Sequence, residues 1–212
     1  MTSRTLSKKT SSKPTRVTRD ADATRRGLIT AARKLFGQHG FAGTSVDEVV
    51  KAAGVTKGAM YHHFKDKDDL FHAVVEQVKV DVTARAADSF FDDTDNDDAM
   101  QRVHRLCIAL IDAHLDPAVQ RITILDARAV FDARTRRDLD TRYEVSLLRG
   151  AFRSAIRAGA IEAQPLAPLA HVFAGALVEA CALIAEADDK DAARREVTAV
   201  VSRLLDGLQP RA

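Results

Sequence analysis

Residues Thr44–Phe64, TSVDEVVKAAGVTKGAMYHHF, form the stretch that decides the fold. It contains two short helical patterns, at 46–53 and 57–63. Only Gly54-Val55-Thr56 separates them, and so short a joint leaves room for little except a sharp corner between two helices. The sequence therefore predicts a helix-turn-helix.

The ends of both helices carry capping residues. Ser45 and Glu48 have the spacing of a capping box, although Thr44 and Asp47 offer the same pattern one residue earlier. Thr56 is a suitable N-cap for the second helix. We expect the first helix to begin at Thr44 or Ser45 and the second to follow Thr56.

The outward face of the second helix carries side chains that suit a DNA groove. Lys57 can meet a guanine edge or a phosphate, and Tyr61 and His62 can bond phosphate oxygens. Gly58 lets the backbone approach closely. The alternative is an ordinary corner between two helices of a helical protein, and the surrounding sequence makes that alternative the weaker one.

Residues 25–75 resemble the DNA-binding domain of the TetR family of bacterial transcriptional regulators. The matching segments are Ala31-Ala32-Arg33-Lys34-Leu35-Phe36, Gly40-Phe41, Thr44-Ser45-Val46, Ala53-Gly54-Val55-Thr56-Lys57-Gly58, Tyr61-His62-His63-Phe64-Lys65 and Lys67-Asp68-Asp69-Leu70-Phe71. The family has an Ile-Ala pair late in the first helix of the motif, where this chain has Val49-Val50. One small apolar pair replaces another, so the departure does not weaken the resemblance.

The resemblance and the residue types together give a set of candidate DNA contacts. Lys67 joins the set because it lies near the start of the next helix, where a lysine slightly opposes the helix dipole unless a phosphate binds there. An ordinary surface lysine is the alternative. The candidates are Thr44, Ser45, Thr56, Lys57, Gly58, Tyr61, His62 and Lys67.

Charge is divided unevenly along the chain, although the net charge is only +2. Residues 1–67 contain 14 Lys and Arg against 5 Asp and Glu, whereas residues 68–212 contain 18 against 25. Such segregation favours a polyanionic partner at the N-terminal end. We expect that partner to be double-stranded DNA.

The first 19 residues are rich in Ser, Thr, Lys and Arg and are almost free of apolar side chains. Such a segment buries too little surface to offset the entropy of ordering, so we expect a disordered basic arm. It serves either as a solubilising tail or as an arm that touches DNA, and the sequence does not decide between them. The expected domains are the arm at 1–19, the DNA-binding domain at 20–66, and an effector-binding and dimerisation domain at 67–212.

Composition indicates a soluble protein of the cytoplasm. The sequence has 46% hydrophobic residues, enough for a sizeable core, and shows neither a signal peptide nor an apolar run near the 18 residues of a membrane span. Cys107 and Cys181 lie within apolar helical patterns and have no metal-binding spacing, so we expect two buried thiols.

Helical periodicity and breakers account for the rest of the chain, and no strand pattern or internal repeat occurs. The sequence predicts an all-α fold of about nine helices. In addition to the pair above, the expected helices cover about 20–38, 65–90, 99–114, 118–131, 134–158, 165–184 and 191–208.

The last two helices favour self-association. The helix after Pro165 is rich in small apolar residues on more than one face, including Gly175, Ala176 and Ala180, and the final helix has a wide apolar stripe. The resemblance implies a homodimer joined by these two helices, which suits a palindromic operator. Burial of both faces within one subunit is the alternative.

Catalytic and cofactor-binding motifs are absent from the sequence, so an enzyme, a cofactor and a metal are not expected. Two stretches of the sequence resemble metal sites in part. The acidic run 92–98 lacks the glycine and the closing glutamate of a calcium loop. His104, Cys107 and His114 share a helix face but span too long an axial distance for one zinc ion, so core packing or an organic-ligand pocket is favoured.

Taken together, the sequence predicts a homodimeric DNA-binding regulator, most simply a repressor that a small-molecule effector releases from its operator. The helix from about residue 65 would couple the two domains. The alternative is a ligand-independent DNA-binding or architectural protein whose second domain only dimerises. Candidate cavity residues, for most of which core packing is the competing role, are Phe90, Phe91, His104, Cys107, Ile111, Arg128, Phe131, Tyr143 and Phe173.

Overall fold

The computed structural model describes residues 16–91 and 98–210. These residues form helices and connecting turns and contain no strand, so the expected all-α fold is confirmed. The expectations for most of the basic arm and for the acidic run concern residues 1–15 and 92–97, which lie outside the described residues.

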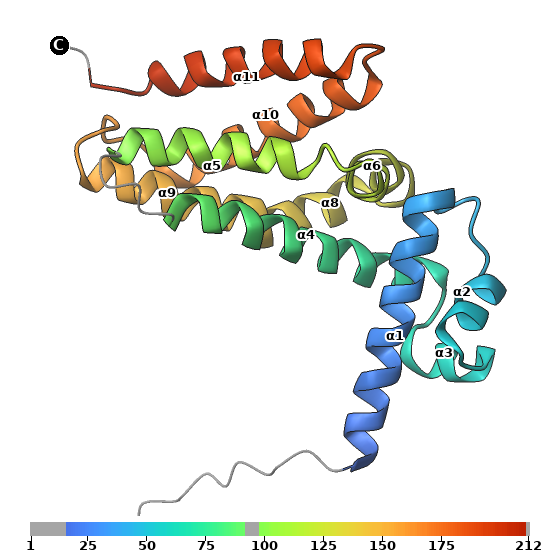
Figure 1. Cartoon of the computed structure of the whole chain (residues 1–212). Helices are drawn as coiled ribbons and strands as arrows, with labels where there is room; N and C mark the ends of the chain where they lie inside the picture. The colour runs from blue at the N-terminus through green and yellow to red at the C-terminus, as the bar shows by residue number, and fades with distance from the viewer. Residues whose placement is uncertain (1–15, 92–97, 211–212) are drawn as a thin grey trace, which may run out of the picture.

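The described helices agree closely with those expected from the sequence (Figure 1). Two pairs of α-helices are each joined by a π-helical segment into one continuous run, which brings the described residues to nine helical runs. The sequence did not predict the two π-helical segments. The elements are α1 (Arg16–His39), α2 (Val46–Ala53), α3 (Lys57–His63), α4 (Lys67–Phe91), α5 (Ala99–Ala113), α6 (Pro117–Gln120), η1 (Arg121–Asp126), α7 (Ala127–Val130), α8 (Ala133–Asp140), η2 (Thr141–Val145), α9 (Ser146–Arg157), α10 (Leu166–Glu186) and α11 (Lys190–Asp206).

Helices α1, α2 and α3 lie together at one end of the molecule, and α4 leads from them into the larger bundle (Figure 1). There α4 packs against α5, and α9 packs against α5 and α10. Helix α11 covers the outer side of α5 and α10. The N-terminal bundle and the larger bundle are therefore connected by one long helix.

Four phenylalanine rings bind the two parts of the molecule together. Phe71 of α4 is fully buried, and its ring lies 5.2 Å from Phe36 of α1 and 4.9 Å from Phe41. On the side of the larger bundle, the Phe71 ring lies 5.4 Å from Phe131. Aromatic pairs at these distances attract one another beyond their buried area, so Phe71 of α4 holds contacts with both parts of the molecule.

A second junction is formed by the run from α6 to α7. The Asp126 carboxylate accepts a hydrogen bond of 2.7 Å from the backbone N–H of Phe41, and Arg121 donates to the Gln38 carbonyl at 3.2 Å. A Cβ atom on Gly37 would lie 2.7 Å from Ala118 Cβ, so glycine is needed for α1 and α6 to approach this closely. The segment η1 thus holds the N-terminal bundle directly.

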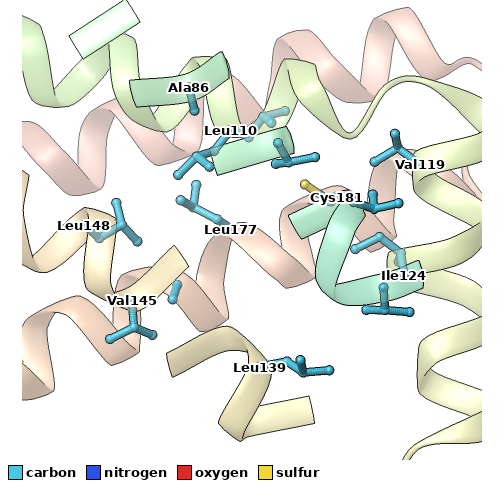
Figure 2. Close-up of a cluster of buried hydrophobic side chains, with 14 of the residues drawn as sticks. Ala86, Leu110, Val119, Ile124, Leu139, Val145, Leu148, Leu177 and Cys181 are labelled. Carbon is cyan, nitrogen blue, oxygen red and sulfur yellow. The ribbon is translucent and has the colours of Figure 1, made fainter. Parts of the chain in front are cut away.

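The core of the larger bundle is apolar and draws on most of its helices. Figure 2 shows Leu110, Leu148 and Leu177 directed toward one another, with Cys181 beside them. Both cysteines are free and buried, as expected.

The sequence-based view of membrane spans needs a correction. By length and composition, α10 could cross a membrane, because its most apolar window has a mean hydropathy of 1.8. Half of that window is buried inside the protein. A core helix that also carries an exposed apolar face explains this composition.

Candidate nucleic-acid interface and internal cavity

The helix-turn-helix is fixed by caps at both helices. Ser45 Oγ accepts from the Glu48 N–H at 3.2 Å, and the Ser45 N–H donates to Glu48 Oε2 at 2.8 Å, so the capping box is confirmed with Ser45 as N-cap. Gly54 ends α2 with a φ of 68°, a left-handed conformation that glycine adopts without strain. Thr56 Oγ1 then accepts from the Ala59 N–H at 3.1 Å and caps α3.

Helix α3 buries one side and exposes the other. Met60 is fully buried against the small bundle. The opposite side is open to solvent, and half of the Tyr61 surface is accessible. Six of the eight predicted contact residues are exposed and gather around α3 and its approach, namely Ser45, Thr56, Lys57, Gly58, Tyr61 and His62.

The prediction for Thr44 is corrected by its burial. The residue is only 2% exposed, and its hydroxyl donates to the Gly40 carbonyl at 2.8 Å. A side chain enclosed in this way stabilises the turn before α2 and has no surface to offer DNA. The sequence pattern could not separate it from Ser45, because both residues suit an N-cap.

Lys67 is partly engaged inside the protein. Its ammonium donates to the carbonyls of Phe41 and Thr44 at 2.9 and 3.1 Å and lies 4.1 Å from the centre of the Phe41 ring. An ammonium has three N–H bonds, so one donor remains beyond the two carbonyls. A phosphate contact by Lys67 stays a prediction.

Lys57 has a partner that the sequence did not reveal. Its ammonium lies 3.0 Å from Asp47 of α2, and the hydrogen bond that it donates to the Asp47 carboxylate raises the pKa of Lys57. Both side chains are largely exposed, so this ion pair is weak and can open. At Gly58 a Cβ atom would meet only Thr56 Oγ1 at 3.9 Å, so the free protein does not require glycine there.

An internal cavity of about 50 Å³ lies between α4, the α6–α7 run, α8 and α10. Its lining residues are Val75, Lys79, His114, Thr123, Ile124, Ala127, Arg128, Phe131, Arg136, Leu139, Asp140 and Val178. A smaller void of about 10 Å³ adjoins it and is lined by Leu110, His114, Glu144, Ala174, Leu177, Val178 and Cys181. Because His114 and Val178 line both spaces, these two side chains form the partition.

A buried ion cluster stands beside these spaces. Lys79 Nζ donates to Asp140 Oδ1 at 2.8 Å and to Glu144 Oε1 at 2.9 Å. Burial lowers the pKa of Lys79, but the charges of Glu144 and Asp140 outweigh burial and leave that pKa raised. Burial raises the pKa of Glu144, and the charge of Lys79 opposes the rise. The ammonium is therefore held in its charged form by two carboxylates.

Of the nine predicted cavity residues, Arg128 and Phe131 line the cavity. Phe91 is 76% exposed, and His104 bonds Asp206 at 3.0 Å. Phe173 packs on the Phe152 ring. These placements give Phe91, His104 and Phe173 other surroundings. The predictions for Phe90, Cys107, Ile111 and Tyr143 are corrected as well, since none of them lines the described cavity.

Sequence reasoning placed His114 in core packing or an organic-ligand pocket, and it does line both spaces. It missed the other polar residues that line them: Lys79, Thr123, Arg136, Asp140 and Glu144. One signal was present. Lys79 adjoins Val78 and lies four residues after Val75 and three before Val82, on the apolar stripe of α4. A lysine inside such a stripe is rarely buried without an anionic partner.

Helices α10 and α11 carry an exposed apolar face, here called the α10–α11 face. An open groove of about 440 Å³ runs along it and is lined mainly by apolar residues. Four large apolar side chains on this face are more than half exposed: Val172, Leu183, Val200 and Leu204. Ala176 and Ala180 both line the groove, and Ala180 lies at its floor with only 5% of its surface exposed.

His114 makes stability depend on pH. Burial lowers the pKa of His114 from 6.5 to about 4, so between these values the unfolded chain binds a proton that the folded protein does not. As the pH falls below 6.5, the free energy of unfolding should therefore decrease by about 1.4 kcal/mol per pH unit. Urea unfolding of His114→Gln should show a shallower pH slope than the wild type. His171→Gln, at an exposed position, is the control, and an unchanged slope in His114→Gln contradicts the assignment.

Comparison with known families matches both parts of the chain. Residues 28–74 match the family described as bacterial regulatory proteins, tetR family, and residues 100–208 match the tetracyclin repressor-like C-terminal domain. A TetR-family transcriptional regulator of known structure from Pectobacterium atrosepticum is 32% identical, with 93% of this chain and 99% of that chain covered and a TM-score of 0.79.

Other relatives match more narrowly. The regulator AcrR of Shigella flexneri is 51% identical over 57 residues, and the repressor AcnR of Corynebacterium glutamicum is 38% identical over 53. These matches cover 27% and 25% of this chain and 26% and 28% of those proteins. RolR, solved in complex with resorcinol, shares the fold at 22% identity and a TM-score of 0.68, with 92% of this chain and 98% of that chain covered.

Proposed function

Because the chain belongs to the TetR family of bacterial regulatory proteins, we propose that it is a sequence-specific DNA-binding transcriptional regulator of the cytoplasm. We further propose that it is a repressor which a small molecule releases from its operator. The observation that carries the proposal is the exposed face of α3. This short helix is capped at its start and packed through Met60, and its Lys57, Tyr61 and His62 are exposed to solvent.

We propose three domains with the bounds expected from the sequence: a basic arm at 1–19, a DNA-binding domain at 20–66, and a domain for effector binding and dimerisation at 67–212. Residues 16–19 of the arm already belong to α1. The proposed dimer joins two copies through the α10–α11 face. Two recognition helices presented in this way would meet a palindromic operator.

Two elements support a coupling between the cavity and the DNA-binding domain. Helix α4 contributes Val75 and Lys79 to the cavity and Phe71 to the aromatic junction. Segment η1 contributes Thr123 and Ile124 to the cavity, and its Asp126 holds Phe41. A ligand that widened the cavity would push both elements against the DNA-binding domain. RolR, which shares this fold, was solved in complex with resorcinol, and this supports a small organic ligand for the present chain.

A test of the proposal separates base reading from clamping. The operator is first selected from a random duplex pool, and fluorescence anisotropy then compares it with a scrambled duplex. We expect Lys57→Ala to lose about 1–3 kcal/mol on the operator and much less on the scrambled duplex, because Lys57 lies at the helix end that meets base edges. Tyr61→Phe should weaken both duplexes alike, since its neutral hydroxyl meets the backbone.

The matched control is Lys51→Ala, which removes an exposed lysine from the end of α2. It should flatten the salt dependence at most and leave sequence preference intact. If selection yields no preferred duplex, or if the wild type binds both duplexes equally, the protein is not a sequence-specific regulator.

A further inference from the structure

The polar side chains around the cavity are unevenly matched, since each donor side chain has at least one acceptor, whereas two acceptor atoms have no donor in the described part of the chain. Thr123 Oγ1 donates to the Val119 carbonyl at 2.8 Å, and Lys79 donates to two carboxylates. Arg128 donates to Glu179, and Arg136 to the carbonyls of Arg128 and Phe131.

The two acceptors belong to Glu144 and His114. Glu144 Oε2 is buried and has no hydrogen-bond partner among the residues described. His114 Nδ1 lies 2.8 Å from the Leu110 carbonyl, which can only accept, so Nδ1 carries the proton. In the neutral ring Nε2 is then an acceptor. A buried oxygen without a donor costs about 1–3 kcal/mol, more when it is charged, so a molecule that supplies a donor is favoured there.

The charges around the spaces are already balanced. Lys79, Arg128 and Arg136 line the spaces with three positive charges, and Asp140 and Glu144 line them with two negative ones. The third carboxylate is that of Glu179, which pairs with Arg128 from outside the lining. Because Lys79 and Glu144 are almost fully buried, a charged guest beside them would leave one charge unmatched where little water reaches, at a large cost in free energy. The guest that fits is neutral and donates hydrogen bonds.

The size of the two spaces and the residues of their walls further limit the kind of guest molecule that fits. The cavity of about 50 Å³ has room for a few non-hydrogen atoms, and it joins the smaller void if the Val178 side chain turns aside. The walls away from the ion cluster are apolar and include Phe131, Leu139 and Leu177. A ring is larger than the two spaces together, so a one-ring guest binds only when these walls move apart.

We propose that the effector is a compact neutral hydroxyl compound, of about one ring, whose O–H groups donate to Glu144 Oε2 and His114 Nε2. This inference rests on the proposed function and names the chemistry of its effector. Binding would supply the missing donor and force apart α4, η1 and α10, three of the elements that line the two spaces.

The experiment titrates the full-length protein with four probes of similar size by calorimetry. Phenol is neutral and donates a hydrogen bond, toluene has no donor, benzoate is an anion and benzylammonium is a cation. We expect phenol to bind at least ten times more tightly than each of the other three. Equal binding of phenol and toluene would show apolar burial alone and would overturn the proposal, as would preference for either ion.

Variants place the binding at the cavity. Glu144→Gln should weaken phenol at least tenfold, because a neutral amide oxygen is a poorer acceptor than a carboxylate and its N–H groups compete as donors. Glu162→Gln, at an exposed position, should bind phenol as the wild type does. If Glu144→Gln does not fold, the four-probe comparison on the wild type still decides the question.

Operator binding is measured separately, so that two failures can be told apart. If no probe binds, and a crystal structure shows only an ordered water on Glu144 Oε2 while operator binding persists, this inference falls and the regulator stands. If phenol binds as expected, the operator should weaken it, and phenol should weaken the operator by the same factor. Phenol binding without any sequence-specific DNA binding would leave the cavity assignment intact and remove the regulatory role.

Discussion

The double variant Leu183→Glu/Val200→Glu is expected to be a folded monomer whose operator affinity is lower by about 100-fold or more. Leu183 is 53% exposed and Val200 is 56% exposed, and both line the groove of the α10–α11 face. In a dimer the new carboxylates would be buried without partners, at a cost far above that of a lost apolar contact. Operator affinity falls because the two helix-turn-helix units are no longer linked. Binding of one unit to its half-site then no longer holds the second unit close to the other half-site.

Sedimentation velocity at micromolar concentration measures the assembly, and circular dichroism checks that the variant is folded. The matched control is Leu125→Glu, which places the same charge on an exposed apolar residue of η1, away from this face. It should stay dimeric. A wild-type protein that sediments as a monomer, or a double variant that remains a dimer, contradicts the proposed interface. Ala180 is unsuitable for this test, since it is buried within the protomer and a charge there would unfold the chain.

The helix-turn-helix could be predicted almost residue by residue because its signals are local. Ser45 and Glu48 cap each other across one turn, and Gly54 and Thr56 act within their own corner. The bounds of α2 and α3 therefore follow from neighbours in the sequence. Thr44 shows the limit, since its capping chemistry was visible but its burial depends on the turn from Gly40.

The cavity could not be predicted, because it is made by residues far apart in the chain. Lys79 meets Asp140 and Glu144 across separations of 61 and 65 residues, and no local pattern pairs them. The sequence-based prediction of cavity residues favoured large apolar and aromatic side chains such as Phe91 and Phe173. In the structure Phe91 is exposed and Phe173 packs on Phe152. In this protein the polar residues that interrupt an apolar stripe were the better guide, and Lys79 is the example.

The π-helical segments escaped prediction for a related reason. Each adds a widened turn to a run whose apolar spacing still suits an α-helix. Segment η1 lies where one run must line the cavity with Thr123 and Ile124 and also hold Phe41 through Asp126. The π-helical geometry of η1 thus depends on two contacts with distant residues, one at the cavity and one at Phe41. The local sequence of η1 gives no sign of either contact.

Lys79→Met is expected to destabilise the protein by about 3–5 kcal/mol, because it leaves a buried carboxylate without its counter-charge. The side chains of Lys79 and Glu144 are only 7% and 6% exposed. Asp140 is 30% exposed and can turn toward water, so Glu144 bears most of the cost. The free energy of unfolding is measured by urea titration at one fixed protein concentration, since dimerisation contributes to it.

The double variant Lys79→Met/Glu144→Met should recover most of that loss, because apolar side chains of similar volume can replace a buried ion pair at little cost. Arg194→Met is the matched control. It breaks the Arg194–Asp112 pair, whose side chains are 36% and 40% exposed, and it should cost less than about 1 kcal/mol. If Lys79→Met costs no more than Arg194→Met, then Glu144 is neutral in the folded protein. If instead the double variant is as unstable as the single one, packing around Lys79 rather than charge holds α4 against η2.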